Sequence, residues 1–343
     1  MFKGLFDTQT RFAKIDRNGD PLRKLDEMVD WSIFLPELAS LREKVDPSKG
    51  GRPPFSALLK FKMLILQALY NLSDDSLEQQ VLDRLSFMRF LGLGMGDDVP
   101  DAKTIWAFRE SLKERGLVEK LFARFDDFLN RSGFTAKRGQ IVDASIVEVP
   151  IRRDRGEVND KVKQGETIDE WTPAQRAQKD VDARWTRKND DSFFGYKNHI
   201  CSDVEYKLVR AYEVTPASVH DSNVFESLLR PNPDPSAYAD SAYMSGDRVK
   251  TMLSLDSPWL PCLNEKGYTG RPLTAGQRLA NRERSRHRAR VEHVFGAQCM
   301  RAGNLLLRGI GIARAAVKIG LRNLAYNLAR FALLASRRRG IVS

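Results

Sequence analysis

The sequence is poor in the residues that bind zinc or form disulfides. Its 343 residues include three cysteines and four histidines. The cysteines are far apart, no Cys-x-x-Cys pair occurs, and the histidines lack zinc-ligand spacing; these residues are Cys201, Cys262, Cys299, His199, His220, His287 and His293. The pattern argues against a structural zinc site and a disulfide framework, and it fits a reduced cytoplasm.

Long apolar runs are missing as well. The N-terminal segment has no uninterrupted apolar stretch of the kind that secretory signals contain. No run reaches the roughly 18 apolar residues of a membrane span, since the C-terminal candidate is interrupted by Arg314, Lys318, Arg322 and Arg330. We therefore expect neither a secretory signal nor a membrane partner.

Acidic residues are almost absent from the last quarter of the chain. Residues 266–343 hold 17 Lys and Arg and only two acids, Glu283 and Glu292, a net charge of +15. The rest of the chain has a net charge of −4, against +11 for the whole protein. Such a block fits a polyanionic partner, because each neutralised phosphate releases counterions, and it equally fits a solvated basic surface.

Apolar periodicity divides the chain into a helical part and a mixed part. Residues 52–130 read as short helices, which suit either a helix-turn-helix DNA reader or a plain bundle. A strand near residues 140–149 precedes a segment in which 21 of the 44 residues 148–191 are charged, which we expect to be a mobile insertion. A hairpin, helices and two short strands follow, and residues 279–300 read as one long basic helix. This order predicts an α/β core with a mixed sheet flanked by helices.

Three carboxylates stand where carboxylates are costly. Asp143 lies inside an apolar strand, Asp240 ends another, and Glu292 lies on the basic helix beside Val294 and Phe295. Taken singly, each has an ordinary explanation: a turn cap for Asp143, a helix N-cap for Asp240, and an ion pair with Arg288 for Glu292. Together they are the hard oxygen ligands that two Mg²⁺ ions use to cleave phosphodiesters.

The segments around these acids resemble the catalytic blocks of DDE transposases of the insertion sequence five family. The resemblance rests on Asp143-Ala-Ser-Ile, Asp240-Ser-Ala-Tyr and Arg288-Ala-Arg-Val-Glu292, separated by 97 and 52 residues. It extends over about residues 30–335, through Gly51-Arg-Pro-Pro, Asp101-Ala-Lys-Thr-Ile-Trp, Gly195-Tyr-Lys-Asn-His, Thr215-Pro-Ala-Ser-Val-His-Asp and Leu321-Arg-Asn-Leu. The chain departs from the family pattern at Ser285 and Cys299, where tyrosine and lysine are usual.

The resemblance implies a fold, a reaction and partners. The fold is a ribonuclease-H-like core with an N-terminal all-helical domain. The reaction is cleavage at the ends of a bacterial insertion sequence, followed by transfer of the freed 3′-hydroxyl into target DNA. Asp143, Asp240 and Glu292 are the expected catalytic metal ligands, for two Mg²⁺ ions or Mn²⁺ in their place. The partners are double-stranded DNA, as terminal inverted repeats and target, and a second copy of the chain on nucleoid DNA in the cytoplasm.

Further residues are expected to support this site or to bind DNA. On one helix, Arg284, Arg288 and Glu292 would share a face, because they recur every four residues. Lys197 and His199 alternate on a strand, so they share a face and either contact DNA or order the acids; His199 equally fits a core histidine. The remaining DNA-binding candidates are Arg301 and Arg52. The residues expected to support the acids are Ser145, Tyr243, His220 and Asp221. His220 and Asp221 also fit a helix cap, and Asp221 is a second choice of metal ligand.

These expectations give three regions and two rival functions. The regions are a helical DNA-binding part (1–135), a catalytic core (136–300) with a charged insertion at about 148–192, and a basic C-terminal helical element (301–343). The rivals are a ribonuclease-H-like nuclease that cuts without joining and a DNA-binding protein that has lost catalysis.

Overall fold

The computed structural model describes residues 7–41, 53–151, 156–164, 171–176, 178–188 and 190–340. The chain forms two compact units, Met1–Leu129 with Leu324–Ser343, and Asn130–Asn323. These divisions fall inside α8 (Leu117–Arg131) and α15 (Ile312–Arg338), whereas the sequence predicts boundaries after residues 135 and 300. Each unit is described by itself.

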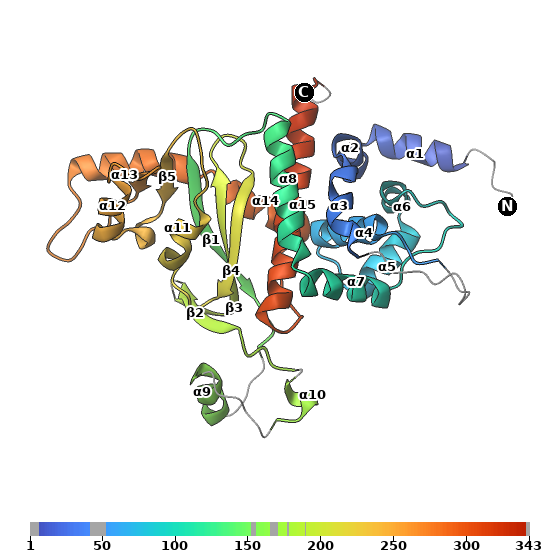
Figure 1. Cartoon of the computed structure of the whole chain (residues 1–343), viewed down its shortest axis with the longest axis horizontal. Coiled ribbons are helices and arrows are strands. Elements are labelled where there is room, and N and C mark those ends of the chain that lie inside the picture. Colours follow the sequence, from blue (N-terminus) through green and yellow to red (C-terminus); the bar gives the residue numbers. More distant parts are fainter. Residues whose placement is uncertain are drawn as a thin grey trace. The chain divides into compact units, whose positions relative to one another are not determined.

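The first unit is helical, as the sequence predicts. Polar N-cap residues precede its helices, at the positions where turn residues give way to apolar periodicity. The side chains of Ser56, Ser73 and Asp101 accept hydrogen bonds from backbone N–H groups in the first turns of α4, α5 and α7. Its core is aromatic, with Phe34 and Phe61 at a ring separation of 4.9 Å. The elements are α1 (Asp7–Arg17), α2 (Pro21–Met28), η1 (Trp31–Phe34), α3 (Leu35–Ala39), α4 (Ala57–Tyr70), α5 (Asp74–Asp83), α6 (Leu85–Leu91), α7 (Ala102–Glu114) and the start of α8 (Figure 1).

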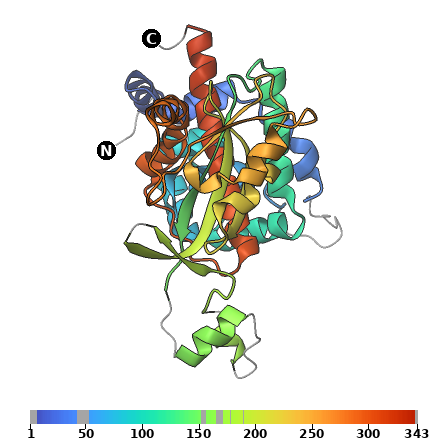
Figure 2. The ribbon, with the colours of Figure 1, turned by 90° about the vertical axis from the view of Figure 1, so that its left-hand side faces the viewer.

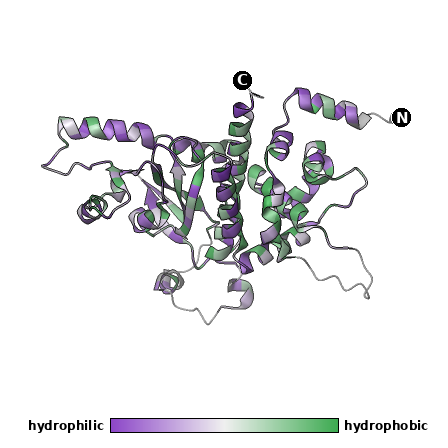
Figure 3. Cartoon of the chain, turned by 45° about the horizontal axis from the view of Figure 1, so that its top comes forward, coloured by the Kyte–Doolittle hydropathy of each residue, from purple (hydrophilic) through white to green (hydrophobic). Residues whose placement is uncertain are grey.

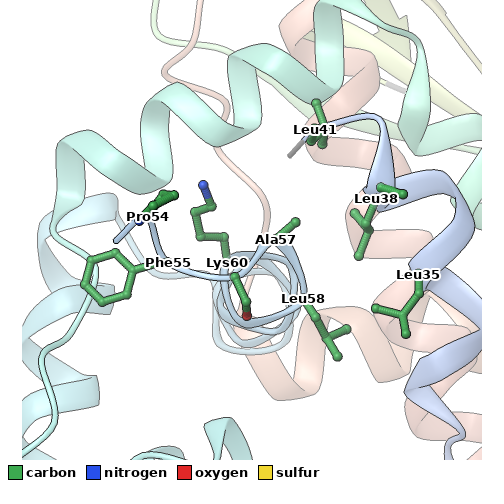
Figure 4. Close-up of a pocket in the computed structure, with 10 residues that line it drawn as sticks. Leu35, Leu38, Leu41, Pro54, Phe55, Ala57, Leu58 and Lys60 are labelled. Atoms are coloured by element: carbon green, nitrogen blue, oxygen red, sulfur yellow. The ribbon is translucent and has the colours of Figure 1, made fainter. Parts of the chain in front are cut away.

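A hollow of about 230 Å³ lies in this unit between α3 and the start of α4. Its walls are apolar apart from Lys60, and they include Leu35, Leu38, Phe55 and Leu58 (Figure 4). No candidate site residue lines it among the described residues.

The second unit contains the mixed sheet that the sequence predicts. Its main strand order is β4-β3-β1-β5-β6, in which β4, β3 and β1 are antiparallel neighbours and β1, β5 and β6 run parallel. Helices flank this sheet (Figures 1 and 2), which confirms the ribonuclease-H-like fold class. The strands are β1 (Gln140–Glu148), β3 (Asp191–Asp203), β4 (Val209–Pro216), β5 (Ser236–Ala239) and β6 (Leu260–Leu263).

Each face of the sheet has its own apolar cluster, because side chains alternate along a strand. One cluster joins Val142 and Cys201 to the short helical segments on that face. The other joins Val147 and Tyr196 to Ile319 of α15. The helical elements are η3 (Asp221–Val224), α11 (Phe225–Leu228), η4 (Ser241–Tyr243), α12 (Gly246–Met252), α13 (Ala275–Arg288), α14 (Glu292–Ala302) and α15.

The charged insertion contributes more structure than its composition suggests. It forms α9 (Gly156–Gln164), α10 (Pro173–Arg176) and β2 (Arg184–Lys188), and β2 pairs with the first residues of β3. Trp185 packs on Phe194 at 5.3 Å, and Ala183 is buried. The last residues of the predicted insertion are thus anchored, since β2 pairs with β3 and Trp185 packs on Phe194.

Asp180 ties this segment to the start of α15. Its Oδ1 accepts a 2.6 Å hydrogen bond from the Tyr196 hydroxyl, and its Oδ2 accepts one of 3.1 Å from the Gly311 N–H. Asp182 accepts a 2.9 Å bond from the Ile312 N–H. The two acids satisfy backbone N–H groups that have no partner inside the helix, at its positive end.

The predicted helix over residues 279–300 is two helices. Between α13 and α14 the backbone tightens, with bonds from the Val291 N–H to the Arg288 carbonyl and from the Val294 N–H to the Val291 carbonyl. These are three-residue bonds of the 3₁₀ type. Val291 and Val294 are fully buried, and Arg290 donates to the Val204 carbonyl at 2.9 Å. Apolar burial at the junction thus overrides the helical pattern.

No helix among the described residues is both long enough and apolar enough to span a bilayer.

Replacing Asp180 by alanine should destabilise the protein by about 2–4 kcal/mol, since the buried Tyr196 hydroxyl and the Gly311 N–H lose their acceptor. Urea unfolding of the full chain measures this change. Asp190→Ala is the matched control, because the Asp190 side chain is fully exposed. Equal stability of the two variants would contradict the anchoring role of Asp180.

Candidate active site

Asp143 lies on β1, and Asp240 directly follows the neighbouring parallel strand β5. In the pairing of β1 with β5, Gln140 lies opposite Ala237 and Ile141 opposite Tyr238, an offset of 97 residues. Continued two residues past the last of these pairs, the same offset leads from Asp143 to Asp240. Adjacent strands are about 4.8 Å apart, so strand pairing brings together two acids that are distant in the chain.

Both aspartates leave the sheet on the face that carries α13. Side chains two residues apart on a strand share a face. Asp240 therefore shares the face of Tyr238, and Asp143 that of Ile141, which pairs with Tyr238. The Tyr238 ring stacks on His287 of α13 at 4.8 Å. The helix and the two carboxylates lie on one side of the sheet.

Asp143 is a largely buried carboxylate among other charges. Its side chain is 17% exposed, and its Oδ2 lies 3.5 Å from Nη1 of Arg288. Burial raises the pKa of Asp143 to about 6; the Ala144 N–H and Arg288 lower it, and the charges of Asp240 and Glu292 raise it further. Asp240 and Glu292 are therefore close enough to Asp143 to act on its charge.

Asp240 is also a helix cap. It precedes the short helix η4, and its Oδ1 accepts a 2.8 Å hydrogen bond from the Ala242 N–H. The cap uses one oxygen, and a carboxylate has a second oxygen with free lone pairs. Capping and metal binding are thus compatible at this residue.

Glu292 is the first residue of α14 and is exposed. The break after α13 separates it from the helix that carries Arg284 and Arg288, so the expected continuous face through Glu292 is wrong. Arg288 pairs with Asp143 of the sheet.

A buried polar network holds α14 on the sheet. Asn198 of β3 and Asn323 of α15 exchange two hydrogen bonds of 3.0 Å, and Gln298 of α14 donates to Asn323 at the same distance. Arg322 donates to the carbonyls of Gln298 and Gly303 at the end of α14. The network orients the helix that begins at Glu292.

The residues at this place fit a hydrated divalent ion. Mg²⁺ is usually bound by one or two carboxylates, with water and substrate phosphate in its other positions. Asp143 and Asp240 supply that pair. Polar atoms beside them lack hydrogen-bond partners in the described part of the chain: the Tyr243 hydroxyl, Nδ1 of His287 and Nε of Arg288. No group of three or more Asp, Glu, His or Cys side chains in that part stands where it could hold an ion.

The basic candidates on α13 and α14 lie in different surroundings. Arg284 donates to the Leu263 carbonyl at 2.8 Å and lies 3.4 Å from Glu265. Arg288 contacts Asp143, and Arg301 is exposed in the last turn of α14. Arg284 thus makes internal contacts that hold α13 on the sheet.

Lys197 and His199 lie on the opposite face of the sheet from Asp143. His199 is fully buried and contacts Thr215 at 2.8 Å, as the core interpretation requires. Burial lowers its pKa to about 4, although Asp221 acts in the other direction. Lys197 forms a 2.8 Å ion pair with Asp221. Arg52 lies outside the described residues.

The remaining candidates lie near the acids. Ser145 follows Asp143 on the same face of β1. His220 caps η3 by accepting the Ser222 N–H, as the cap alternative requires. Tyr243 is buried under the acids, and burial, followed by the charges of Asp143, Asp221 and Asp240, raises its pKa.

A mixed sheet of this order, with one carboxylate inside β1 and another just after the parallel strand β5, suits metal-assisted chemistry on phosphodiesters. The chain belongs to the Transposase DDE domain family, which it matches over residues 134–328. Residues 9–111 match a second family, Transposase domain (DUF772). A similar solved structure is the piggyBac transposase synaptic complex with hairpin DNA, 12% identical over 94% of this chain and 76% of that chain, with a TM-score of 0.48.

Family membership establishes the activity at the level of the class. The chain is a DNA transposase, an enzyme that cleaves DNA and transfers the cut strand. DDE domains of this kind use divalent metal ions and bind DNA. The family therefore favours a joining enzyme over the two rival functions that the sequence left open.

Sequence patterns miss the residues that position α13 and α14. Glu265 accepts from Gln277 and Arg284, and its backbone exchanges hydrogen bonds with Asn281. Such contacts join a loop to a helix over 12 to 19 residues. No local periodicity marks them.

Asp143→Asn should stabilise the metal-free protein at alkaline pH. A carboxyl whose pKa is raised from 3.8 to about 6 destabilises the folded state above pH 6, where it is ionised in both states. The gain should reach up to about 3 kcal/mol at pH 8 and vanish near pH 4. Urea unfolding in EDTA measures it.

The exposed Asp256 provides the control. Asp256→Asn should shift stability by less than about 0.5 kcal/mol at either pH. A loss of stability in Asp143→Asn at pH 8 would mean that the Arg288 contact outweighs burial.

Proposed function

We propose that Asp143, Asp240 and Glu292 are the catalytic carboxylates of this transposase, and that they bind two Mg²⁺ ions, for which Mn²⁺ can substitute. The parallel pairing of β1 with β5, which leads Asp240 toward Asp143, and the charge effect of Asp240 on Asp143 carry this proposal. This pairing sets two like charges side by side, an arrangement that a divalent cation stabilises. Support for Glu292 comes from its effect on the pKa of Asp143.

The residues divide the work by their chemistry. Asp143 and Asp240 hold the ion from the sheet, and Glu292 approaches from α14. When bound, such ions activate the attacking oxygen and stabilise the leaving oxygen of a phosphodiester. Tyr243, whose hydroxyl has no hydrogen-bond partner in the described part of the chain, would donate a hydrogen bond beside the aspartates. Ser145, His220 and Asp221 keep the strand and the short helices in place around them.

The proposed reaction is two successive displacements at phosphorus. Water cuts the phosphodiester at the end of an insertion sequence, and the freed 3′-hydroxyl attacks a target phosphodiester in line. No protein nucleophile takes part, since oxygen nucleophiles come from water and DNA. Arg288 neutralises phosphate charge at the acids, with Arg284, Arg301 and Arg52 as further DNA contacts. On the other face of the sheet, Lys197 in its ion pair with Asp221 and the buried His199 hold β3 in place.

We further propose that the protein is a member of the insertion sequence five family and binds terminal inverted repeats as a dimer or larger assembly. The motifs around the three acids support the family assignment. The match of residues 9–111 to a transposase domain supports an N-terminal DNA-binding region over residues 1–135. The core (136–300) and the basic C-terminal element (301–343) complete a protein that works on the nucleoid in the cytoplasm.

Removing any one acid should abolish cutting and joining while DNA binding persists. Asp143→Asn, Asp240→Asn and Glu292→Gln should each lower the rate of end cleavage and of strand transfer at least about 1,000-fold, the order of effect when preorganised charge at a reacting phosphate is lost. Gel assays with intact and pre-cleaved end DNA in Mg²⁺ separate the two steps.

Glu283→Gln is the control for Glu292→Gln, because Glu283 is exposed on α13 and pairs with Arg286 of the same helix, away from the acids. It should keep wild-type rates. Cleavage by Asp143→Asn at the wild-type rate, or cleavage by the wild type in EDTA, would falsify the assignment.

Arg288→Gln should bind divalent cations more tightly than the wild type. The guanidinium 3.5 Å from Asp143 competes with a metal for that carboxylate. A partly exposed pair of this kind is worth about 1 kcal/mol, so the Kd for Ca²⁺ measured by calorimetry should fall roughly five-fold. Arg282→Gln, on the outer side of the same helix, should leave it unchanged. A weaker affinity in Arg288→Gln would show that Arg288 orients Asp143 instead.

A further inference from the structure

The helix α13 is attached to the sheet without an apolar face. None of its 14 residues is buried. Hydrophilic residues dominate it (Figure 3). A helix that is polar on all sides gains little stability from apolar burial, so other contacts must hold it on the sheet.

Polar and ring contacts attach the inward side of α13 to the sheet. Gln277, Asn281 and Arg284 bind Glu265 or the Leu263 carbonyl after β6. Further along, Ser285 accepts from Asn264, His287 stacks on Tyr238, and Arg288 reaches Asp143. The inner side thus fixes the helix with its C-terminal end at the acid site.

The outward side carries a row of three arginines at intervals of four residues, Arg278, Arg282 and Arg286. All three are exposed. The one acid of the helix, Glu283, pairs with Arg286 at 2.7 Å. No ion pair or hydrogen bond of the Arg278 or Arg282 side chain is present among the described residues, so both guanidinium groups face solvent.

The length of the arginine row matches a short run of phosphates along one strand of B-DNA. Positions four residues apart on a helix lie about 6 Å apart along its axis. The row therefore spans roughly 12 Å, the length of three or four phosphates of one strand of B-DNA. It ends within one turn of Arg288, which contacts Asp143.

We propose that Arg278, Arg282 and Arg286 of α13 bind the backbone phosphates of the DNA strand that leads away from the bond to be cut. The proposal rests on the proposed acid site for its direction along the helix. It adds the outward row of α13 to the phosphate contacts, whereas Arg284 on the inward side contacts the Leu263 carbonyl and Glu265. Such contacts set the position of the strand and carry no base specificity.

An acidic protein or a membrane surface fits the row less well. A membrane-bound helix needs an apolar face opposite its basic face, and the opposite face of α13 consists of hydrogen-bonded polar side chains. Guanidinium groups pair readily with phosphate oxygens at regular intervals. The regular spacing and the acid site at one end favour nucleic acid.

The test is the salt dependence of DNA binding by the full chain. A fluorescent duplex that carries an element end with flanking DNA is titrated with protein in Ca²⁺ at 50–200 mM salt, and anisotropy is measured. In Arg278→Gln/Arg282→Gln, the slope of log K against log salt should become shallower by about 2, and Kd at 0.1 M salt should rise at least about 10-fold. A duplex of unrelated sequence should lose the same amount.

Two further variants make the result specific. Arg138→Gln/Arg187→Gln removes the same charge from exposed, ion-paired positions of the same unit, and it should change the slope by less than about 0.5. Arg278→Lys/Arg282→Lys keeps the charge and should keep most of the slope. Equal effects of the two glutamine pairs, or no effect of Arg278→Gln/Arg282→Gln, would overturn the proposal. Cleavage by Asp143→Asn is assayed separately, so failure of the acid site is distinguished from failure of the row.

Discussion

Repulsion between carboxylates is the constraint on which the rest of this site depends. The parallel pairing of β1 with β5 sets Asp143 beside Asp240, and Asp143 is mostly buried. Each charge makes the other more costly, and burial adds to the cost. The fold tolerates the pair because Arg288 supplies a nearby positive charge and the Ala144 N–H donates to the buried carboxylate.

Polar contacts hold the two helices that border the acids. Gln277, Asn281 and Arg284 fasten α13, and the network of Asn198, Asn323 and Gln298 fastens α14. Hydrogen bonds fix direction and register, whereas apolar packing tolerates small shifts. A site that must align phosphates to within a fraction of an ångström benefits from that kind of attachment.

The sequence predicts the fold class and much of the core from local patterns. Alternating apolar residues locate the hairpin of β3 and β4, and the short runs before Asp240 and around Leu263 locate the parallel strands. The prediction of one helix over residues 279–300 fails because the junction at Val291 depends on burial against distant residues, which a local pattern does not contain.

The sequence by itself determined the nature of this protein: three acids in their spaced motifs, a basic final quarter, and the order of strands and helices. Tertiary structure decided which charges meet. It paired Arg288 with Asp143, buried His199, placed Arg284 against Leu263 and turned Arg278 and Arg282 to solvent. Residue type and spacing are properties of the chain, whereas the partner of a charge depends on how distant segments pack.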